Sequence, residues 1–214
     1  MNADRRSLVA ALALAPLLAR AQQFAGESIA YTTLKKPLPL ETPGKIEVAE
    51  FFWYGCIHCY HMEALLEKWV PQLKPDTQFR RIPAVFDDPR FMHDAAIFYS
   101  FEALGVLEKL HRPFFDAIHL NRLRTNNAQA LAEWLTRNGV DVKKFEATMN
   151  SFGVQSKVKR AAQLTAAAAI DGTPALAVQG RFTISAEQGP TQEGMLATAA
   201  RLVDVVRRSM PASK

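Results

Sequence analysis

The chain contains two cysteines, Cys56 and Cys59, and they form a single Cys-x-x-Cys segment. Two thiols at this spacing can close into a disulfide and reopen, which moves two electrons to or from another cysteine pair. The apolar run Ile46–Phe52 precedes the segment, and a helix-like stretch, Tyr60–Leu73, follows it. A Cys-x-x-Cys pair between a strand and a helix is typical of a redox site, so the sequence predicts thiol–disulfide exchange.

Cys56 is expected at the N-terminus of the following helix. The unpaired backbone N–H groups and the dipole of a helix start favour a negative charge, and therefore favour the thiolate over the thiol. Because the thiolate is the form that attacks disulfides, the position of Cys56 predicts a reactive nucleophile.

A structural zinc site and a structural disulfide are the alternatives for this pair. Zinc needs four ligands, and His58 and His61 could complete a compact cluster with the two cysteines. The remaining histidines show no paired ligand spacing: His93, His111 and His119. A disulfide across so short a loop would remove little entropy from the unfolded chain. The sequence therefore favours a redox pair, with no metal and no cofactor.

Residues 1–21 are predicted to be a secretory signal peptide. Arg5 and Arg6 precede an apolar run, and Ala19 and Ala21 offer a small-x-small cleavage site. The run is shorter than the roughly 20 residues that span a bilayer, although retention as a membrane anchor is an alternative. General export and twin-arginine export would both carry the chain out of the cytosol.

Charge and cysteine content narrow the classes of function. Cleavage after Ala21 would remove three arginines and one aspartate, which lowers the net charge from +5 to +3. The basic clusters alternate with apolar residues at helical spacing, so nucleic-acid binding is not expected. The mature chain of about 190 residues is long enough to bury a core without a disulfide framework.

The elements that must position the cysteines follow the order strand, helix, strand, helical block, hairpin and helix. The predicted strands are Ser28–Thr32, Ile46–Phe52, Gln78–Phe86, and a hairpin of Ala175–Val178 and Arg181–Ile184 that turns at Gln179 and Gly180. The predicted helices are Tyr60–Leu73, Asp88–Leu104, Leu107–Leu120, Asn127–Asn138, Asp141–Asn150, Gln155–Ile170 and Thr191–Ser209.

This order fits an α/β thioredoxin-like fold with an inserted all-helical domain. Residues 22–88 and 170–214 are expected to form the thioredoxin-like domain, and residues 89–169 the inserted helical domain.

Two motifs give the chain a resemblance to a known family. The first is the strand Val48–Phe52 followed by the cysteine pair, with His58 before the second cysteine, and the second is Gly172–Ala175 before a strand. With the export signal and the element order, they make the chain resemble the DsbA-type thiol:disulfide oxidoreductases of the bacterial periplasm, over essentially the whole mature chain. Ile57 stands where the best-known members have proline, so the resemblance does not fix the redox strength.

The resemblance implies a role for each residue at the site. Cys56 would be the exposed nucleophile, and Cys59, one turn later, the buried resolving thiol. His58 lies where its ring N–H or its positive charge could stabilise the Cys56 thiolate. The bond between Thr173 and Pro174 would be cis and face the cysteines, so that the Thr173 backbone can hydrogen-bond an extended substrate chain.

Glu50 interrupts an apolar strand, and burial there would require a partner or a proton for its carboxylate. The resemblance places it beneath the active site, where it would aid proton transfer to the inner thiol. Arg80 or Arg81 could pair with it from the next strand, and the sequence does not choose between them. Trp53 and Tyr54 could form an apolar rim where substrate docks, or belong to the core.

The expected function is that of a periplasmic enzyme that donates the Cys56–Cys59 disulfide to newly exported, unfolded proteins with reduced cysteines. The resemblance implies a monomer that is reoxidised by a membrane quinone-linked partner of the DsbB type. A disulfide isomerase or reductase is one alternative, but such enzymes usually carry a dimerisation domain, for which the residues before Ile46 are too few. A non-enzymatic, exported metal-binding or holdase module is the other.

Overall fold

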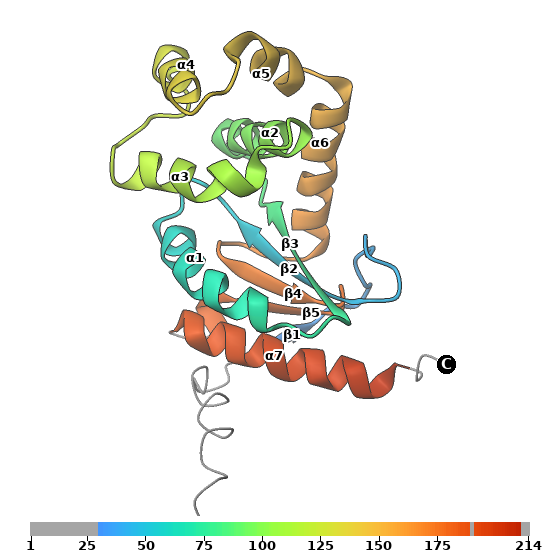
Figure 1. The fold of residues 1–214 in the computed structure, drawn as a ribbon. Helices are drawn as coiled ribbons and strands as arrows, with labels where there is room; N and C mark the ends of the chain where they lie inside the picture. The colour runs from blue at the N-terminus through green and yellow to red at the C-terminus, as the bar shows by residue number, and fades with distance from the viewer. Residues whose placement is uncertain (1–29, 189–190, 211–214) are drawn as a thin grey trace, which may run out of the picture.

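The computed structural model describes residues 30–188 and 191–210 (Figure 1). The predicted signal peptide, and Ser28 and Ile29 of the predicted first strand, lie outside these residues. None of the helices within the described residues has the length and apolar character that a membrane span requires.

A five-stranded mixed sheet forms the centre of the molecule, in the order β1-β5-β4-β2-β3. Its strands are β1 (Thr32–Thr33), β2 (Ile46–Phe52), β3 (Thr77–Pro83), β4 (Ala175–Val178) and β5 (Phe182–Ser185). Strand β2 is parallel to β3 and antiparallel to β4, and every residue of β2 is buried. Such a strand, covered on both faces, explains the nearly continuous apolar run in the sequence.

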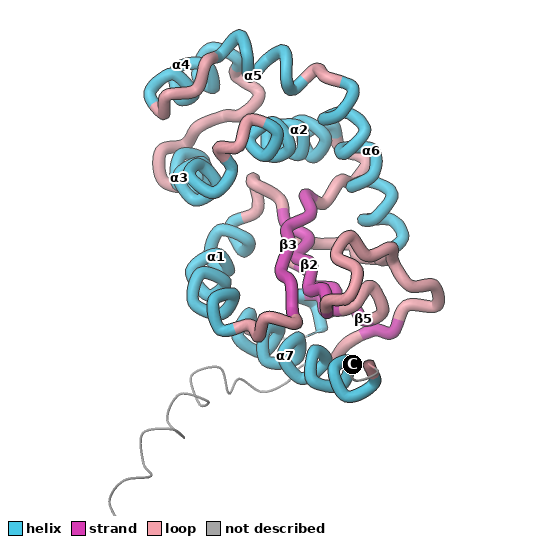
Figure 2. The backbone as a smooth tube through the Cα atoms, turned by 45° about the vertical axis from the view of Figure 1, so that its right-hand side comes forward, coloured by secondary structure: helices cyan, strands magenta, loops and turns pink. Residues whose placement is uncertain are grey.

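Helices cover both faces of the sheet. One face packs on α1 (Ile57–Trp69) and α7 (Gln192–Ser209), through a core that includes Met62, Leu66 and Leu196. The other face packs on α2 (Pro89–Ala103) and α6 (Phe152–Ala167). Figure 2 shows the strands enclosed by helices, with α7 at one side of the sheet and the helical block beyond the other.

The helical block consists of α2 and α6 with α3 (Leu107–His119), α4 (Ala128–Arg137) and α5 (Val142–Met149). Side chains at the helix N-caps accept hydrogen bonds from backbone N–H groups two or three residues further on: Asp88, Asn127, Asp141 and Ser151. These caps mark the helix starts in the sequence. The core of the block is aromatic, and Phe52, Tyr54 and Cys59 belong to the same cluster. The block therefore reaches the cysteine pair.

Several predicted bounds differ from the structure, and the first strand is Thr32–Thr33, without the predicted Ala30 and Tyr31. Helix α1 begins at Ile57 rather than Tyr60, because Cys56 itself is the N-cap, and it ends at Trp69 before a 3-10 turn. Strand β3 ends at Pro83 rather than Phe86. Helix α6 runs from Phe152 to Ala167, three residues earlier at both ends than predicted, since Ser151 caps its start.

The hairpin between β4 and β5 turns at the predicted residues, although β5 spans Phe182–Ser185 rather than Arg181–Ile184. Gln179 and Gly180 have φ angles of 52° and 59°, the left-handed values that a two-residue hairpin turn requires. A Cβ at Gly180 would lie 2.5 Å from the carbonyl oxygen of Leu38, so the close approach of the leader segment also requires glycine there.

Candidate active site

Cys56 lies at the N-cap of α1 and is half-buried. Its φ and ψ of −87° and 116° are extended, so its side chain turns back over the first helical turn. The backbone N–H of Cys59 points at the Cys56 Sγ at 3.4 Å. The sulfur therefore occupies the place of a capping oxygen, which is where a helix favours negative charge.

The pKa of Cys56 is lowered from 9.0 to about 5. The largest cause is a hydrogen bond from the Cys59 side chain, and the Thr173 side chain and the backbone N–H groups of Cys59 and His58 add to it. Partial burial of Cys56 opposes this shift but is outweighed. The structure therefore supports the thiolate that the sequence predicts.

In the reduced protein, Cys56 is expected to ionise with a midpoint near pH 5 and to react with an alkylating agent at pH 6, where an ordinary cysteine, with a pKa of about 8.5, scarcely reacts. The ultraviolet absorbance of the thiolate, recorded against pH, measures this midpoint, and peptide mapping identifies the alkylated residue. A midpoint near 8.5 would contradict the electrostatic description of the site.

Cys59 is fully buried, one turn into α1. Burial raises its pKa well above the usual range, and the neighbouring Cys56 and Glu50 raise it further. Both cysteines are reduced in this structure. The pKa of Cys56 is lowered and that of Cys59 is raised, which is the difference that a nucleophile and a resolving thiol require.

The loop before β4 closes over the outer cysteine. The Thr173–Pro174 bond is cis, as the resemblance implies, and the Thr173 carbonyl oxygen lies 3.2 Å from the Cys56 Sγ, from which it accepts a hydrogen bond when Cys56 is a thiol. These residues are separated by 117 positions in the sequence. The fold thus brings the two predicted motifs together.

Glu50 lies in the middle of β2 and is fully buried. Its carboxylate oxygens have no hydrogen-bond partner among the described residues, and the Arg81 Nε lies 3.5 Å from Oε2. Burial and the charge of Glu63 raise the pKa of Glu50 to about 8, although Arg81 opposes them. Its carboxyl group therefore holds a proton at neutral pH.

The two arginines of β3 have different partners. Arg81 stands opposite Glu50 in the strand register, and Arg80, on the other face, pairs with Glu47 at 2.8 Å. Arg81 also forms a two-pronged ion pair with Glu63, at 3.1 and 2.9 Å. The choice that the sequence left open is therefore Arg81.

A network of buried polar side chains continues from Glu63 into the helical block, and it was not predicted from the sequence. His111 of α3 lies 3.2 Å from Glu63 Oε1 through its Nε2 and 2.9 Å from the Tyr54 hydroxyl through its Nδ1. Burial lowers the pKa of His111, so a neutral ring that donates to Glu63 and accepts from Tyr54 satisfies both contacts. Glu63 follows Cys59 by four positions on α1, and this spacing on one helix face is a signal that could have identified it.

Three side-chain contacts hold the active-site segment against the helical block. Trp53 Nε1 donates to Asp94 at 2.7 Å, and the Tyr60 hydroxyl donates to Asp116 at 3.0 Å. His119 Nε2 donates to the backbone carbonyl of Tyr54 at 2.8 Å. The insertion therefore helps to shape the redox site.

His58, Trp53 and Tyr54 differ in position. The His58 side chain is exposed and makes no hydrogen bond or ion pair within residues 30–188 and 191–210, while its carbonyl oxygen accepts from Gln192 at 2.6 Å. Tyr54 is buried and belongs to the core. Trp53 is half-buried at the rim of the segment. Within the same described residues, no group of three or more His, Cys, Asp or Glu side chains could hold a metal ion.

Comparison with known proteins places these features in a family. Residues 47–197 match the model of the DSBA-like thioredoxin domain. The chain is 38% identical over 210 residues to the thiol:disulfide interchange protein DsbA of Burkholderia cepacia, covering 97% of both chains. It is 42% identical to the protein of the same name from Bordetella parapertussis, over 82% of this chain and 83% of that one.

Solved structures agree with the sequence comparison. The crystal structure of Pseudomonas aeruginosa DsbA superposes with a TM-score of 0.78 at 34% identity, covering 85% of this chain and 94% of that chain. The oxidoreductase DsbA from Xylella fastidiosa gives a TM-score of 0.77 at 30% identity, over 83% of this chain and 95% of that chain. The chain therefore belongs to the DSBA-like thioredoxin domain family and is a thiol:disulfide oxidoreductase.

Proposed function

We propose that the protein is a periplasmic dithiol oxidase that donates its Cys56–Cys59 disulfide to newly exported, unfolded proteins. The observation that carries the proposal is the Cys56 Sγ at the N-cap of α1, where the backbone N–H of Cys59 points at it at 3.4 Å and its pKa is lowered to about 5. A site that stabilises the thiolate stabilises the reduced form, and a stable reduced form makes the disulfide a strong oxidant, as is known for DsbA.

The reaction proceeds by two exchange steps. A substrate thiolate attacks the Cys56 Sγ, the Cys56–Cys59 bond breaks, and a mixed disulfide with Cys56 forms. A second thiolate of the same substrate molecule then attacks the substrate sulfur of the mixed disulfide, and Cys56 leaves as a thiolate. Two electrons pass to the cysteine pair, and the substrate gains one disulfide.

The buried carboxyl group of Glu50 serves the inner thiol. Because the pKa of Cys59 is raised, its sulfur must take up a proton once the disulfide opens. Glu50, with a pKa of about 8, is protonated at neutral pH and can supply that proton. A cavity of about 600 Å³ is lined by Glu63, Arg81 and His111 among others. Water in this cavity can return a proton to Glu50 through these groups.

Substrate docks beside Cys56 through its backbone and through apolar contact. The Thr173–Pro174 loop is the place where an extended substrate chain would hydrogen-bond as an added strand, which needs no particular sequence. Ile57 is 44% exposed directly beside the nucleophile and offers apolar contact. The backbone N–H of His58 favours the thiolate, and the His58 side chain is exposed next to Cys56, where it can contact the substrate.

The proposed cellular context follows from the N-terminal sequence and the family. Residues 1–21 are the cleavable signal peptide, residues 22–88 and 170–214 the thioredoxin-like domain, and residues 89–169 the inserted helical domain. The mature protein works as a monomer without cofactor, and a membrane quinone-linked oxidase of the DsbB type reoxidises its cysteines.

Replacement of the resolving thiol tests the proposed function. In Cys59→Ser, the Cys56 thiolate can still attack a disulfide of an exported protein, one thiol of that protein leaves, and a mixed disulfide forms. These adducts are expected to accumulate, because the inner thiol that would attack the Cys56 Sγ and release the partner is absent. Non-reducing gels of periplasmic extract measure the adducts, and reduction should dissolve them. The variant that also carries Cys56→Ser is the control and should show none. If Cys59→Ser gives no adducts, substrate oxidation is not the function.

A further inference from the structure

An arginine cluster, defined as Arg122, Arg124 and Arg137, lies in the helical block near the active-site segment. Arg122 and Arg124 belong to the α3–α4 loop, and Arg137 is the last residue of α4. None of the three guanidinium groups forms an ion pair or a side-chain hydrogen bond with the part of the chain that the structure describes. Arginine side chains without an ion-pair partner pair readily with carboxylates. The cluster therefore offers three guanidinium groups to an anionic partner.

Two adjoining cavities connect the cluster with the redox site. The smaller, of about 250 Å³, is lined by Trp53, Gly55, Ile118 and Arg124 among others. The larger, of about 630 Å³, is lined by all three arginines and by one carboxylate, Glu133. Arg124 lines both cavities, and Gly55 directly precedes Cys56, so the path from the nucleophile to the cluster is short.

The wall of the smaller cavity is fixed by hydrogen bonds. Asp94 accepts from Trp53 Nε1 at 2.7 Å and from the Thr125 hydroxyl at 2.7 Å, and the His93 Nε2 donates to the Thr125 carbonyl at 2.9 Å. A Cβ at Gly55 would overlap the Trp53 ring, so the indole lies directly on the backbone beside Cys56. These hydrogen bonds thus join the active-site segment, α2 and the α3–α4 loop in the wall of the cavity.

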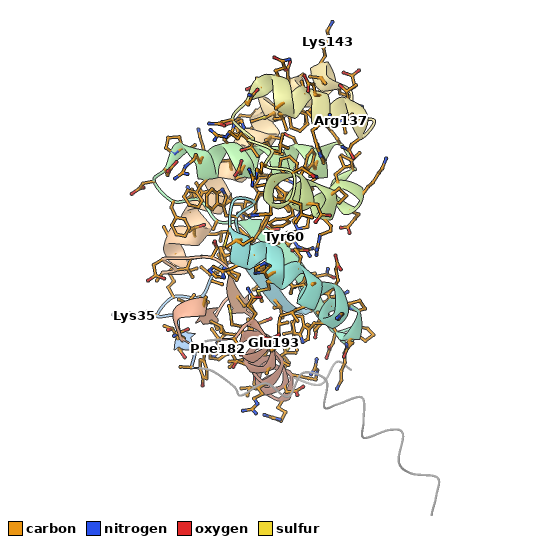
Figure 3. The ribbon with its side chains drawn as sticks, turned by 90° about the vertical axis from the view of Figure 1, so that its left-hand side faces the viewer. Lys35, Tyr60, Arg137, Lys143, Phe182 and Glu193 are labelled. Atoms are coloured by element: carbon orange, nitrogen blue, oxygen red, sulfur yellow. The ribbon has the colours of Figure 1, made fainter. Side chains whose placement is uncertain are left out.

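The charge of the two cavities comes mainly from the cluster. Arg90, at the edge of the smaller cavity, is already paired with Asp88 at 2.7 Å, and the Asp94 carboxylate is buried and hydrogen-bonded. Arg124 is exposed and unpaired in the described chain, as are Arg122 and Arg137. Figure 3 shows Arg137 in the helical block, beyond Tyr60 at the start of α1. A chain bound at Cys56 would meet positive charge in that direction.

We propose that the arginine cluster binds acidic side chains that lie close in sequence to the substrate's reacting cysteine. The inference rests on the proposed oxidase function, since it concerns which cysteines that enzyme oxidises fastest. An extended chain advances about 3.3 Å per residue, so residues two to four positions from a cysteine held at Cys56 can reach the cavities. An acidic residue there meets the guanidinium of Arg124, and a basic residue is repelled.

The test uses the oxidised full-length mature protein and a set of dithiol peptides. The peptides are identical except for Glu, Gln or Lys at two, three or four positions from the first cysteine, on either side. The rate constant for peptide oxidation is measured by acid quench and mass spectrometry. At the best position, the Glu peptide is expected to react about threefold to fivefold faster than the Lys peptide, the range of an exposed ion pair. About 0.5 M salt, where the Debye length is roughly 4 Å, should erase the difference.

Charge reversal assigns the preference to the cluster. Arg124→Glu is expected to make the Lys peptide the faster substrate, with both rates expressed relative to that of the Gln peptide in the same variant. Arg208→Glu on α7 makes the same change in net charge at an exposed site in another element and should keep the wild-type preference. An Arg124→Glu variant with an unchanged ratio of Glu to Lys rates would overturn the inference.

Two further outcomes distinguish the substrate role of the arginine cluster from a failure of the oxidase function and from membrane binding. If no peptide is oxidised, the proposed function fails, whereas oxidation of all peptides at one rate overturns only the arginine cluster's role. Sedimentation with vesicles of anionic phospholipid tests a membrane partner. Vesicle binding that Arg124→Glu abolishes, together with an unchanged peptide preference, would overturn the substrate role and assign the cluster to the membrane surface.

Discussion

At pH 7 the reduced protein is expected to unfold at a higher denaturant concentration than the form with the Cys56–Cys59 disulfide. A cross-link usually stabilises a fold by restricting the unfolded chain, but this loop is so short that it restricts little. Reduction creates a thiolate at the N-cap of α1, where its pKa is about 5. The thiolate's stabilisation is available only in the folded, reduced state.

The size of this effect follows from the pKa difference between the folded and unfolded states. Cys56 has a pKa of about 5 in the fold and about 8.5 in the unfolded chain, which gives on the order of 2 kcal/mol at pH 7 once solvent screening of the half-exposed sulfur is included. Because the folded pKa is the lower one, the extra stability is fully present above about pH 8.5 and is lost as the pH falls through 5. Denaturant curves of both redox forms at pH 4.5, 7 and 8.5 measure it.

Substitution at the neighbouring histidine divides the effect between side chain and backbone. His58→Ala is expected to narrow the gap between the two redox forms and to make the protein less oxidising in equilibrium with glutathione. A gap remains, because the backbone N–H groups of Cys59 and His58 persist in the variant. His61→Ala, also exposed on α1, is the matched control and should leave the gap unchanged. A disulfide form that proves the more stable would favour the reductase or the structural disulfide instead.

Replacing the buried carboxyl group is expected to change both stability and chemistry. In the wild type, Glu50 keeps its proton in the fold up to a pH of about 8 but loses it near 4.5 in the unfolded chain. The folded state is therefore destabilised progressively between these values, by several kcal/mol at pH 8. Glu50→Gln removes that loss, and Arg81 keeps its ion pair with Glu63. The variant should accordingly be the more stable at pH 8 and similar to wild type near pH 4.5.

The same variant should oxidise substrates more slowly. Without a proton donor next to Cys59, the step that opens the disulfide is expected to slow by about 10²-fold, the lower end of general acid catalysis. The rate of substrate oxidation by Glu50→Gln should also lose the pH dependence near 8 that the Glu50 carboxyl group causes in the wild type. Glu47→Gln is the control, because Glu47 is buried on the same strand but pairs with Arg80 on the other face. If Glu50→Gln and Glu47→Gln behave alike, Glu50 acts through packing and not through its proton.

The sequence was informative wherever a local pattern decides the structure. The apolar run predicted β2 with its bounds, and the helices predicted from Asp88 and Asn127 begin one residue later in the structure, at Pro89 and Ala128. The predicted place of Cys56 at the start of α1 is confirmed, although the helical stretch itself was predicted from Tyr60, three residues after the observed start at Ile57. Cys56 thus both caps α1 and serves as the reactive thiol, because the backbone N–H groups that it caps also stabilise its thiolate.

Features that depend on strand register and domain docking could not be predicted. A shift of one residue between β2 and β3 would exchange Arg80 and Arg81, so only the register assigns Arg81 to Glu50. The contact of His111 with Glu63 joins residues 48 positions apart, and no pattern within α3 indicates it. The hydrogen bond of Trp53 to Asp94 likewise depends on how the helical block packs on the sheet.

The contact between Cys56 and Thr173 also has a consequence for the order in which the chain matures. These residues are 117 positions apart, and β4, which follows Thr173 directly, is the inner neighbour of β2. In a polypeptide that emerges from a ribosome or a membrane pore N-terminus first, the cysteine pair appears long before the strand that completes its surroundings. Until then β2 has one open edge, and the thiols lack the loop that closes over them. The newly made enzyme is thus itself a reduced, incomplete protein, and the surroundings of its cysteines are complete only once the last fifth of the chain has arrived.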